Sequence, residues 1–142
     1  MLTLIAAALL AAPAAADTHH EQFDHGGARV HVTYHARLMP ELRQVGAASA
    51  PGRPATLQCR WQARVTVERS ARAIAGHVAT RRIDVPVLVA GHRPGWCDTQ
   101  AAAIGAEVAA ASDRLRAHLV EVARRDRGVL VAELEQARGR NS

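Results

Sequence analysis

The clearest hydrophobic pattern in the chain is strict alternation of apolar and polar residues over two stretches, residues 29–38 and 57–67. Successive side chains of a strand point to opposite faces, so each stretch predicts a strand with one buried and one solvated face. The predicted buried faces are Val30, Val32, Tyr34, Ala36 and Leu38 in the first stretch, and Leu57, Cys59, Trp61, Ala63, Val65 and Val67 in the second.

The segments that follow these strands carry breaking signals. Met39-Pro40 predicts the end of the first strand, and residues 41–54 are rich in Gly, Pro, Ala and Ser, which favours a flexible loop. The second strand is predicted to break at Ser70–Ala73.

A third extended region changes its phase within its length, which indicates a bulge or a turn at Thr80–Arg82. Pro86 lies in the second half of this region and cannot donate a ladder hydrogen bond, so the strand is expected at a sheet edge. One phase holds Ile74, Gly76 and Val78, and the other holds Ile83, Val85, Val87 and Val89.

Helical spacing replaces alternation after a turn at 91–95. Asp98 is the expected N-cap of a helix that runs to Arg125, and Gly128 is expected to stop it. Residues 129–138 fit a second helical stripe, which we favour, although a short strand there fits the same apolar run. The first stripe recurs at spacings of three and four residues and consists of Ala101, Ile104, Val108, Ala111, Leu115, Leu119 and Val122.

Together these elements predict an α+β fold: an antiparallel β-meander of three or four strands packed against a long C-terminal helix. Cys59 and Cys97 are the only cysteines, and we expect them to form one disulfide that clamps the start of the helix onto the central strand. Closing a loop of this length destabilises the unfolded chain by roughly 4 kcal/mol in the entropic account.

The first sixteen residues have the pattern of a secretory signal peptide. An apolar run precedes Pro13 and Ala14-Ala15-Ala16, which has small residues at both positions that a signal peptidase reads, and cleavage is expected after Ala16. The expected divisions are therefore a signal peptide (1–16), a polar tail (17–28), a single α+β domain (29–138) and a C-terminal tail (139–142). Such a protein is periplasmic or secreted, with no membrane span after cleavage.

The charge of the chain is carried by arginine alone. There are 18 Arg and no Lys against 13 acidic residues, for a net charge of +5. Four arginines on the predicted solvated faces are candidates for an anion-binding platform: Arg29, Arg37, Arg60 and Arg64. Guanidinium groups bind phosphate and carboxylate bidentately, so lipopolysaccharide phosphate or a peptidoglycan carboxylate is a candidate partner. Export and the presence of only four aromatic residues argue against nucleic acid.

The expected mature N-terminus offers a candidate metal site. Cleavage after Ala16 would expose Asp17-Thr18-His19, in which a free amine, two backbone amides and an imidazole can surround Cu(II) or Ni(II) in a square plane.

No arrangement of residues predicts catalysis. None of the four serines lies in a G-x-S-x-G elbow, and no pair of acidic residues shares a predicted strand face. The sequence therefore favours a small, exported, non-enzymatic binding or interaction module of the bacterial envelope, without a cofactor. Its partner would be an envelope protein or an anionic envelope component. The alternative function is Cu(II) or Ni(II) binding at Asp17-Thr18-His19.

Overall fold

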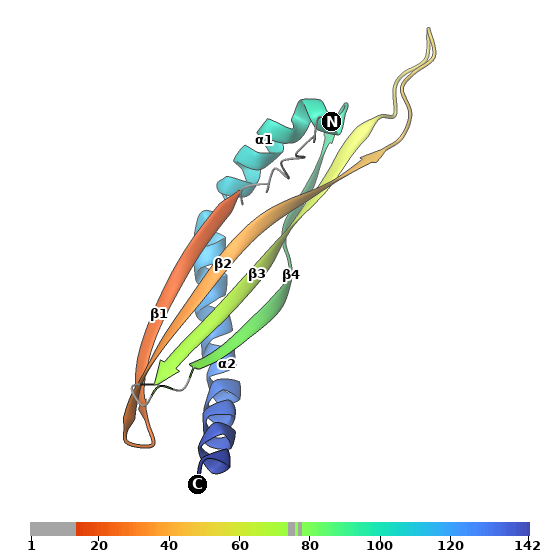
Figure 1. Cartoon of the computed structure of the whole chain (residues 1–142). Helices are drawn as coiled ribbons and strands as arrows, with labels where there is room; N and C mark the ends of the chain where they lie inside the picture. The colour runs from red at the N-terminus through yellow and green to blue at the C-terminus, as the bar shows by residue number, and fades with distance from the viewer. Residues whose placement is uncertain (1–13, 74–75, 77) are drawn as a thin grey trace, which may run out of the picture.

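The chain forms a four-stranded antiparallel sheet followed by two helices. The computed structural model describes residues 14–73, 76 and 78–142. Each strand pairs with the next along the chain, so the sheet order is β1-β2-β3-β4 (Figure 1). The elements are β1 (Ala15–His25), β2 (Ala28–Val45), β3 (Gln58–Ala73), β4 (Val78–Pro94), α1 (Cys97–Ala109) and α2 (Ser112–Arg140).

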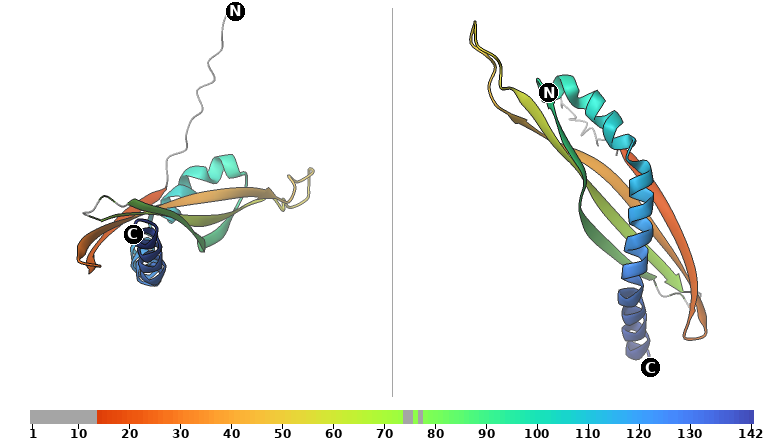
Figure 2. Two further views of the ribbon diagram at one scale, coloured as in Figure 1. Left: turned by 60° about the horizontal axis from the view of Figure 1, so that its bottom comes forward. Right: turned by 180° about the vertical axis from the view of Figure 1, so that it is seen from behind.

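Both helices cover the same face of the sheet, and the opposite face is left open (Figure 2, right). This arrangement confirms the predicted α+β meander with a long C-terminal helix and one disulfide. The two predicted apolar faces lie in the core: in β2 they are at most 1% exposed, and from Cys59 to Val67 in β3 at most 4%. Each fully buried Val or Leu stabilises the fold by roughly 1.5–3 kcal/mol, so these two strands supply much of the core energy.

The predicted polar tail, residues 17–28, is wrong, because most of it belongs to β1. Eleven consecutive residues pair with β2, from Ala15 opposite Leu38 to His25 opposite Ala28. The inward side chains of β1 are mainly polar, and α2 binds them through charge. Asp17 lies 2.9 Å from the Arg116 guanidinium, Glu21 lies 4.0 Å from that of Arg127, and His25 lies 3.0 Å from Glu135. Arg127 also covers the Phe23 ring at 4.2 Å.

Two predicted strand ends are also wrong. β2 continues through Pro40 to Val45, so residues 41–45 belong to a strand and not to the predicted loop. Pro40 is tolerated because β1 pairs only as far as Leu38 of β2, which leaves β2 at the sheet edge there. β3 continues through the predicted break to Ala73, because Ala71 and Ala73 keep the inward phase and are buried.

β4 is an edge strand, as its proline predicted, but its irregularity is not where the sequence placed it. The ladder is regular at Thr80–Arg82, and the register shifts lie opposite Ala63–Thr66 of β3. β4 runs on to Pro94 through most of the predicted turn at 91–95. Ile74, assigned to this strand in the sequence, lies outside the described residues.

The predicted continuous helix from Asp98 to Arg125 is two helices. The chain turns at Ala110 and Ala111, because the sheet is twisted: α1 packs on β2 and β3, whereas α2 crosses β1, β2 and β4 (Figure 2). Helix over 129–138 is confirmed, but Gly128 does not stop α2, which continues to Arg140. Glycine costs about 1 kcal/mol in a helix interior, which burial of Leu130 and Leu134 outweighs.

The disulfide holds α1 at the end of the central strand. Cys59 and Cys97 are bonded, and their Cα atoms are 4.8 Å apart. Asp98 is not the N-cap as expected. The helix begins two residues earlier, with Trp96 as N-cap, and the Cys97 N–H donates to Gln44 Oε1 at 2.6 Å. A side chain of β2 thus satisfies one of the first four backbone donors of the helix, which have no partner within it.

We predict that replacing both cysteines, Cys59→Ser with Cys97→Ser, lowers the free energy of unfolding by about 2–5 kcal/mol, because the unfolded chain gains freedom. Urea denaturation of the variant and of the oxidised wild type measures the difference. Thiol-reactive labelling of both cysteines in the native oxidised protein would contradict the bond.

A buried ionic network joins α2 to the sheet, and the sequence analysis missed it. Arg69 of β3 has a fully buried side chain and donates to Asp126 Oδ2 at 2.8 Å. The Tyr34 hydroxyl donates to the same oxygen at 3.1 Å, and Arg81 reaches Oδ1 at 3.3 Å. Glu133 binds the other end of the Arg69 guanidinium.

The pKa values in this network follow from its burial and charges. Burial alone would lower the pKa of Arg69, but the hydrogen bonds and charges of Asp126 and Glu133 raise it above the ordinary value. Burial, together with the Asp126 carboxylate, raises the pKa of Tyr34, so its hydroxyl stays protonated as a donor. The network is therefore ionised at Arg69 and neutral at Tyr34 throughout the physiological pH range.

We predict that Asp126→Ala lowers the free energy of unfolding by about 3–5 kcal/mol, because it leaves the Arg69 charge buried without its main partner. The double variant Arg69→Met with Asp126→Leu should lose less than Asp126→Ala alone. Glu121→Ala, which removes a carboxylate from exposed ion pairs of the same helix, should cost at most about 1 kcal/mol. Equal losses for Asp126→Ala and Glu121→Ala in urea denaturation would show that the buried pair is unimportant.

The Asp17–Arg116 pair predicts that the contribution of β1 to the free energy of unfolding depends on pH. The hydrogen bond from Arg116 lowers the pKa of Asp17 below 3.8, so its stabilisation is present above that value and is lost as the pH falls through the folded-state pKa. Asp17→Asn should destabilise the protein by at most about 1 kcal/mol at pH 7, and the difference from wild type should shrink as the solution is acidified below 3.8. Denaturation curves across this range measure it, and a pH-independent difference would contradict the ion pair.

Candidate functional site

The open face of the sheet is the candidate binding surface, because no element of the described structure covers it (Figure 2). The outward side chains of neighbouring strands lie in rows set by the register. The predicted platform arginines, Arg29, Arg37, Arg60 and Arg64, are all on this face and exposed.

The structure does not combine these four arginines into one platform. Arg29 lies 3.2 Å from Asp24, Arg37 lies 3.4 Å from Glu68, and Arg64 lies 3.3 Å from Glu41. Each of the three has an exposed carboxylate that neutralises it locally. Arg60 is different, because it forms no ion pair within the described part of the chain.

Arg60 stands in the middle of a basic row that crosses three strands. Arg43 is directly opposite it on β2, and His92 is directly opposite it on β4. Arg43 likewise forms no ion pair among the residues described. Arg43 was not among the predicted site residues, because residues 41–54 were predicted to form a loop. Together these residues form the row Arg43-Arg60-His92. Like charges directly opposite each other destabilise a sheet, so the Arg43–Arg60 pair carries a cost in the unliganded protein.

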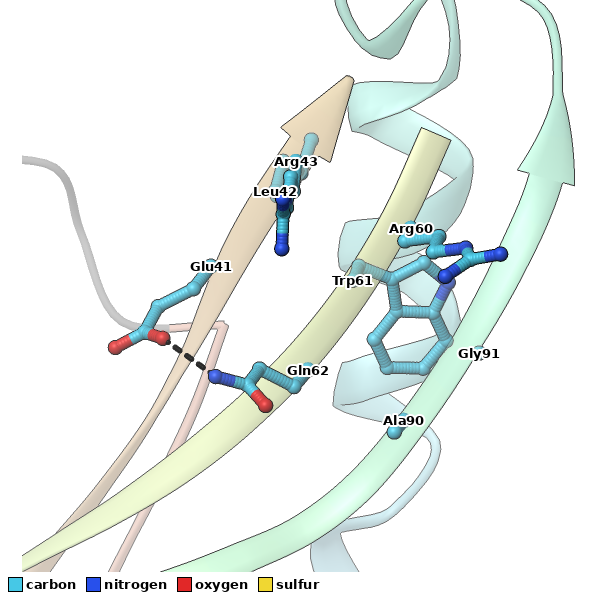
Figure 3. A pocket seen from close by; sticks show the side chains of 8 residues that line it. All are labelled: Glu41, Leu42, Arg43, Arg60, Trp61, Gln62, Ala90 and Gly91. Carbon is cyan, nitrogen blue, oxygen red and sulfur yellow. Dashed lines mark hydrogen bonds between the residues drawn. The ribbon is translucent and has the colours of Figure 1, made fainter. Parts of the chain in front are cut away.

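Arg43 and Arg60 of the basic row line a hollow at the disulfide end of the sheet (Figure 3). The hollow has a volume of about 490 Å³ and is open to solvent. Leu42, Trp61, Ala90 and Gly91 also line the hollow, and the Trp61 indole packs directly against Gly91. A side chain at position 91 would clash with that ring, because a Cβ there would lie 2.8 Å from Trp61 Cζ2.

Glu41 also lines the hollow, and its carboxylate oxygen Oε2 already accepts two hydrogen bonds. Gln62 Nε2 donates to Glu41 Oε2 at 2.9 Å, and Arg64 Nε reaches the same oxygen at 3.3 Å. The Gln62 hydrogen bond, with help from Arg64, lowers the pKa of Glu41 below its ordinary value. Glu41 therefore stays ionised and paired, and the unpaired charge of the hollow is positive.

The candidate metal residues Asp17, Thr18 and His19 lie in β1, extended and paired with Ala36, His35 and Tyr34 of β2. Their side chains alternate between faces: Asp17 binds Arg116, and Thr18 Oγ1 lies 3.0 Å from His35 Nδ1. A square-planar chelate needs one amine, two successive amides and the imidazole around one ion, so these residues would have to leave β2 to form it. Within residues 14–73, 76 and 78–142, no group of three His, Cys, Asp or Glu side chains is arranged to hold a metal ion.

No protein-family model, no curated protein and no solved structure matches the chain. We therefore infer a function from the geometry of the open sheet face.

Proposed function

We propose that this protein is an exported, non-enzymatic binding module that binds an anionic component of the bacterial envelope at the Arg43-Arg60-His92 row. The observation that carries the proposal is that Arg43 and Arg60 face each other on an open sheet face without a carboxylate partner in the described structure. The other arginines of the expected platform all have one.

The chemistry of this pair suits phosphate or carboxylate. Each guanidinium presents a planar fork of donors, and two opposed forks can bind separate oxygens of one anion. An anion placed between them would also remove their mutual repulsion. The ligand would then stabilise the fold by the energy of binding and by the relief of an unfavourable contact.

Export is supported by the leader pattern in the sequence and by the disulfide, which persists in oxidising compartments. In the described residues, no helix is both long enough and apolar enough to cross a membrane. In that compartment the phosphates of lipopolysaccharide and the carboxylates of peptidoglycan share the required chemistry. The two anions share this chemistry, so binding measurements must separate them.

We predict that Arg43→Gln with Arg60→Gln weakens binding of the true ligand by about tenfold or more, because both bidentate contacts are lost. The probes are vesicles containing phosphorylated lipid A and soluble peptidoglycan fragments with free carboxylates, each titrated by calorimetry. The matched control is Arg114→Gln with Arg140→Gln, which removes the same charge from exposed positions of α2.

The control variant should retain wild-type affinity to within about twofold, apart from weak long-range charge effects. Equal loss of binding in both double variants would show attraction by net charge without a site. No binding of either probe by the wild type would overturn the proposal. A stability measurement adds a second readout, because removing the like-charge pair should leave the free energy of unfolding unchanged or slightly higher.

A further inference from the structure

The start of β1 bears on where the leader is removed. The expected cut after Ala16 follows the small-residue pattern Ala14-Ala15-Ala16, but Ala12-Pro13-Ala14 has small residues at the same two positions and would direct the cut to the bond between Ala14 and Ala15. The amino-acid pattern satisfies the peptidase at either bond. The fold distinguishes the two bonds, because one lies inside a paired strand.

A cut after Ala16 would remove the first two pairs of the β1 ladder. Ala15 is opposite Leu38 and Ala16 is opposite Arg37, and β1 begins at Ala15. Ala15 also packs against the core beside Leu38, which is fully buried. Removing Ala15 would expose this part of the core and leave the Leu38 backbone at an open edge. A cut before Ala15 keeps all eleven pairs and removes Ala14, whose N–H donates to the Leu38 carbonyl and whose side chain packs against the core.

The charge on Asp17 supports the same choice. Its carboxylate accepts a hydrogen bond from Arg116 Nε at 2.9 Å. A cut after Ala16 would create an α-ammonium group on Asp17 itself, where it repels the Arg116 guanidinium. A cut before Ala15 places the ammonium two residues away, about 6.6 Å along the strand, where it repels the Arg116 guanidinium less strongly.

We propose that the leader is removed between Ala14 and Ala15, so that the mature protein begins with the whole of β1. The reaction is hydrolysis by the signal peptidase of the exporting cell: one water is consumed, the Ala14 carbonyl becomes a carboxylate, and Ala15 gains a free α-ammonium group. This inference rests on the export part of the proposed function. It also moves His19 to the fifth position of the mature chain, where amine, two amides and imidazole are no longer in register for the square-planar copper site.

The test is to express the full chain in an exporting bacterial host and to determine the intact mass and N-terminal residue of the processed protein. A chain that begins at Ala15 is the expected result, and one that begins at Asp17 overturns the inference while leaving export intact. Full-length chain in the membrane fraction overturns the inference together with export.

Two leader variants sharpen this test. Ala16→Gln places a large residue at the last position before the alternative cut, and processing to Ala15 should continue. Ala12→Gln alters the third residue before the proposed cut and should reduce processing at Ala15 by about tenfold. If Ala16→Gln reduced processing and Ala12→Gln did not, the cut would lie after Ala16.

A comparison of the two mature forms tests whether loss of the first two pairs of β1 destabilises the protein. Both are released from cleavable fusions that leave no additional residue. The form beginning at Ala15 should unfold at a higher urea concentration and show no square-planar Cu(II) absorption band, whereas the form beginning at Asp17 serves as the positive control for that band. Equal stability of the two forms would remove the structural argument for the proposed site.

Discussion

The buried ion pair between Arg69 and Asp126 is the contact that fixes how the long helix lies on the sheet. An apolar stripe alone permits a helix to slide by a turn, because Leu, Val and Ala side chains can exchange places with little loss. A buried charge does not permit this, since a slide would leave Arg69 without its partner at a cost of several kcal/mol. The hydroxyl of Tyr34 and the guanidinium of Arg81 meet the same carboxylate, so three strands of the sheet are held in register with one residue of α2.

β1 can form a strand because the position of α2 is fixed. Ala15 and Phe23 are the inward side chains of β1 that pack against the core, whereas Asp17, Glu21 and His25 depend on reaching Arg116, Arg127 and Glu135 at three levels along the helix. Individually, ion pairs of this exposure stabilise a protein by less than about 1 kcal/mol. They act together with the eleven-residue ladder to β2, and they are available only because the helix axis and rotation are already set.

The sequence predicted the elements whose signals are local. Period-two alternation identified β2 and β3, and the two cysteines identified the disulfide. The missed features depend on partners far along the chain: Arg69 and Asp126 are 57 residues apart, and the polar side chains of β1 have meaning only opposite α2. Some signals were present, since Arg69 continues the inward phase of β3 and Asp126 lies four residues after buried Val122. Neither was identified, because the second strand was predicted to extend only to Val67 and the helix only to Arg125. Arg43 was missed because residues 41–54 were predicted to form a loop.

The edges of the sheet are protected, and this directs attention to its open face. Charged inward side chains and irregular pairing are devices that stop an edge strand from adding a foreign strand. β1 has the first device in Asp17 and Glu21, and β4 has the second in its register shifts. Recognition by strand addition is therefore disfavoured at both edges. The open face has no such protection, and it retains an opposed pair of arginines that form no ion pair in the described part of the chain. Selection for stability alone would remove such a like-charge pair, whereas selection for binding an anion would keep it.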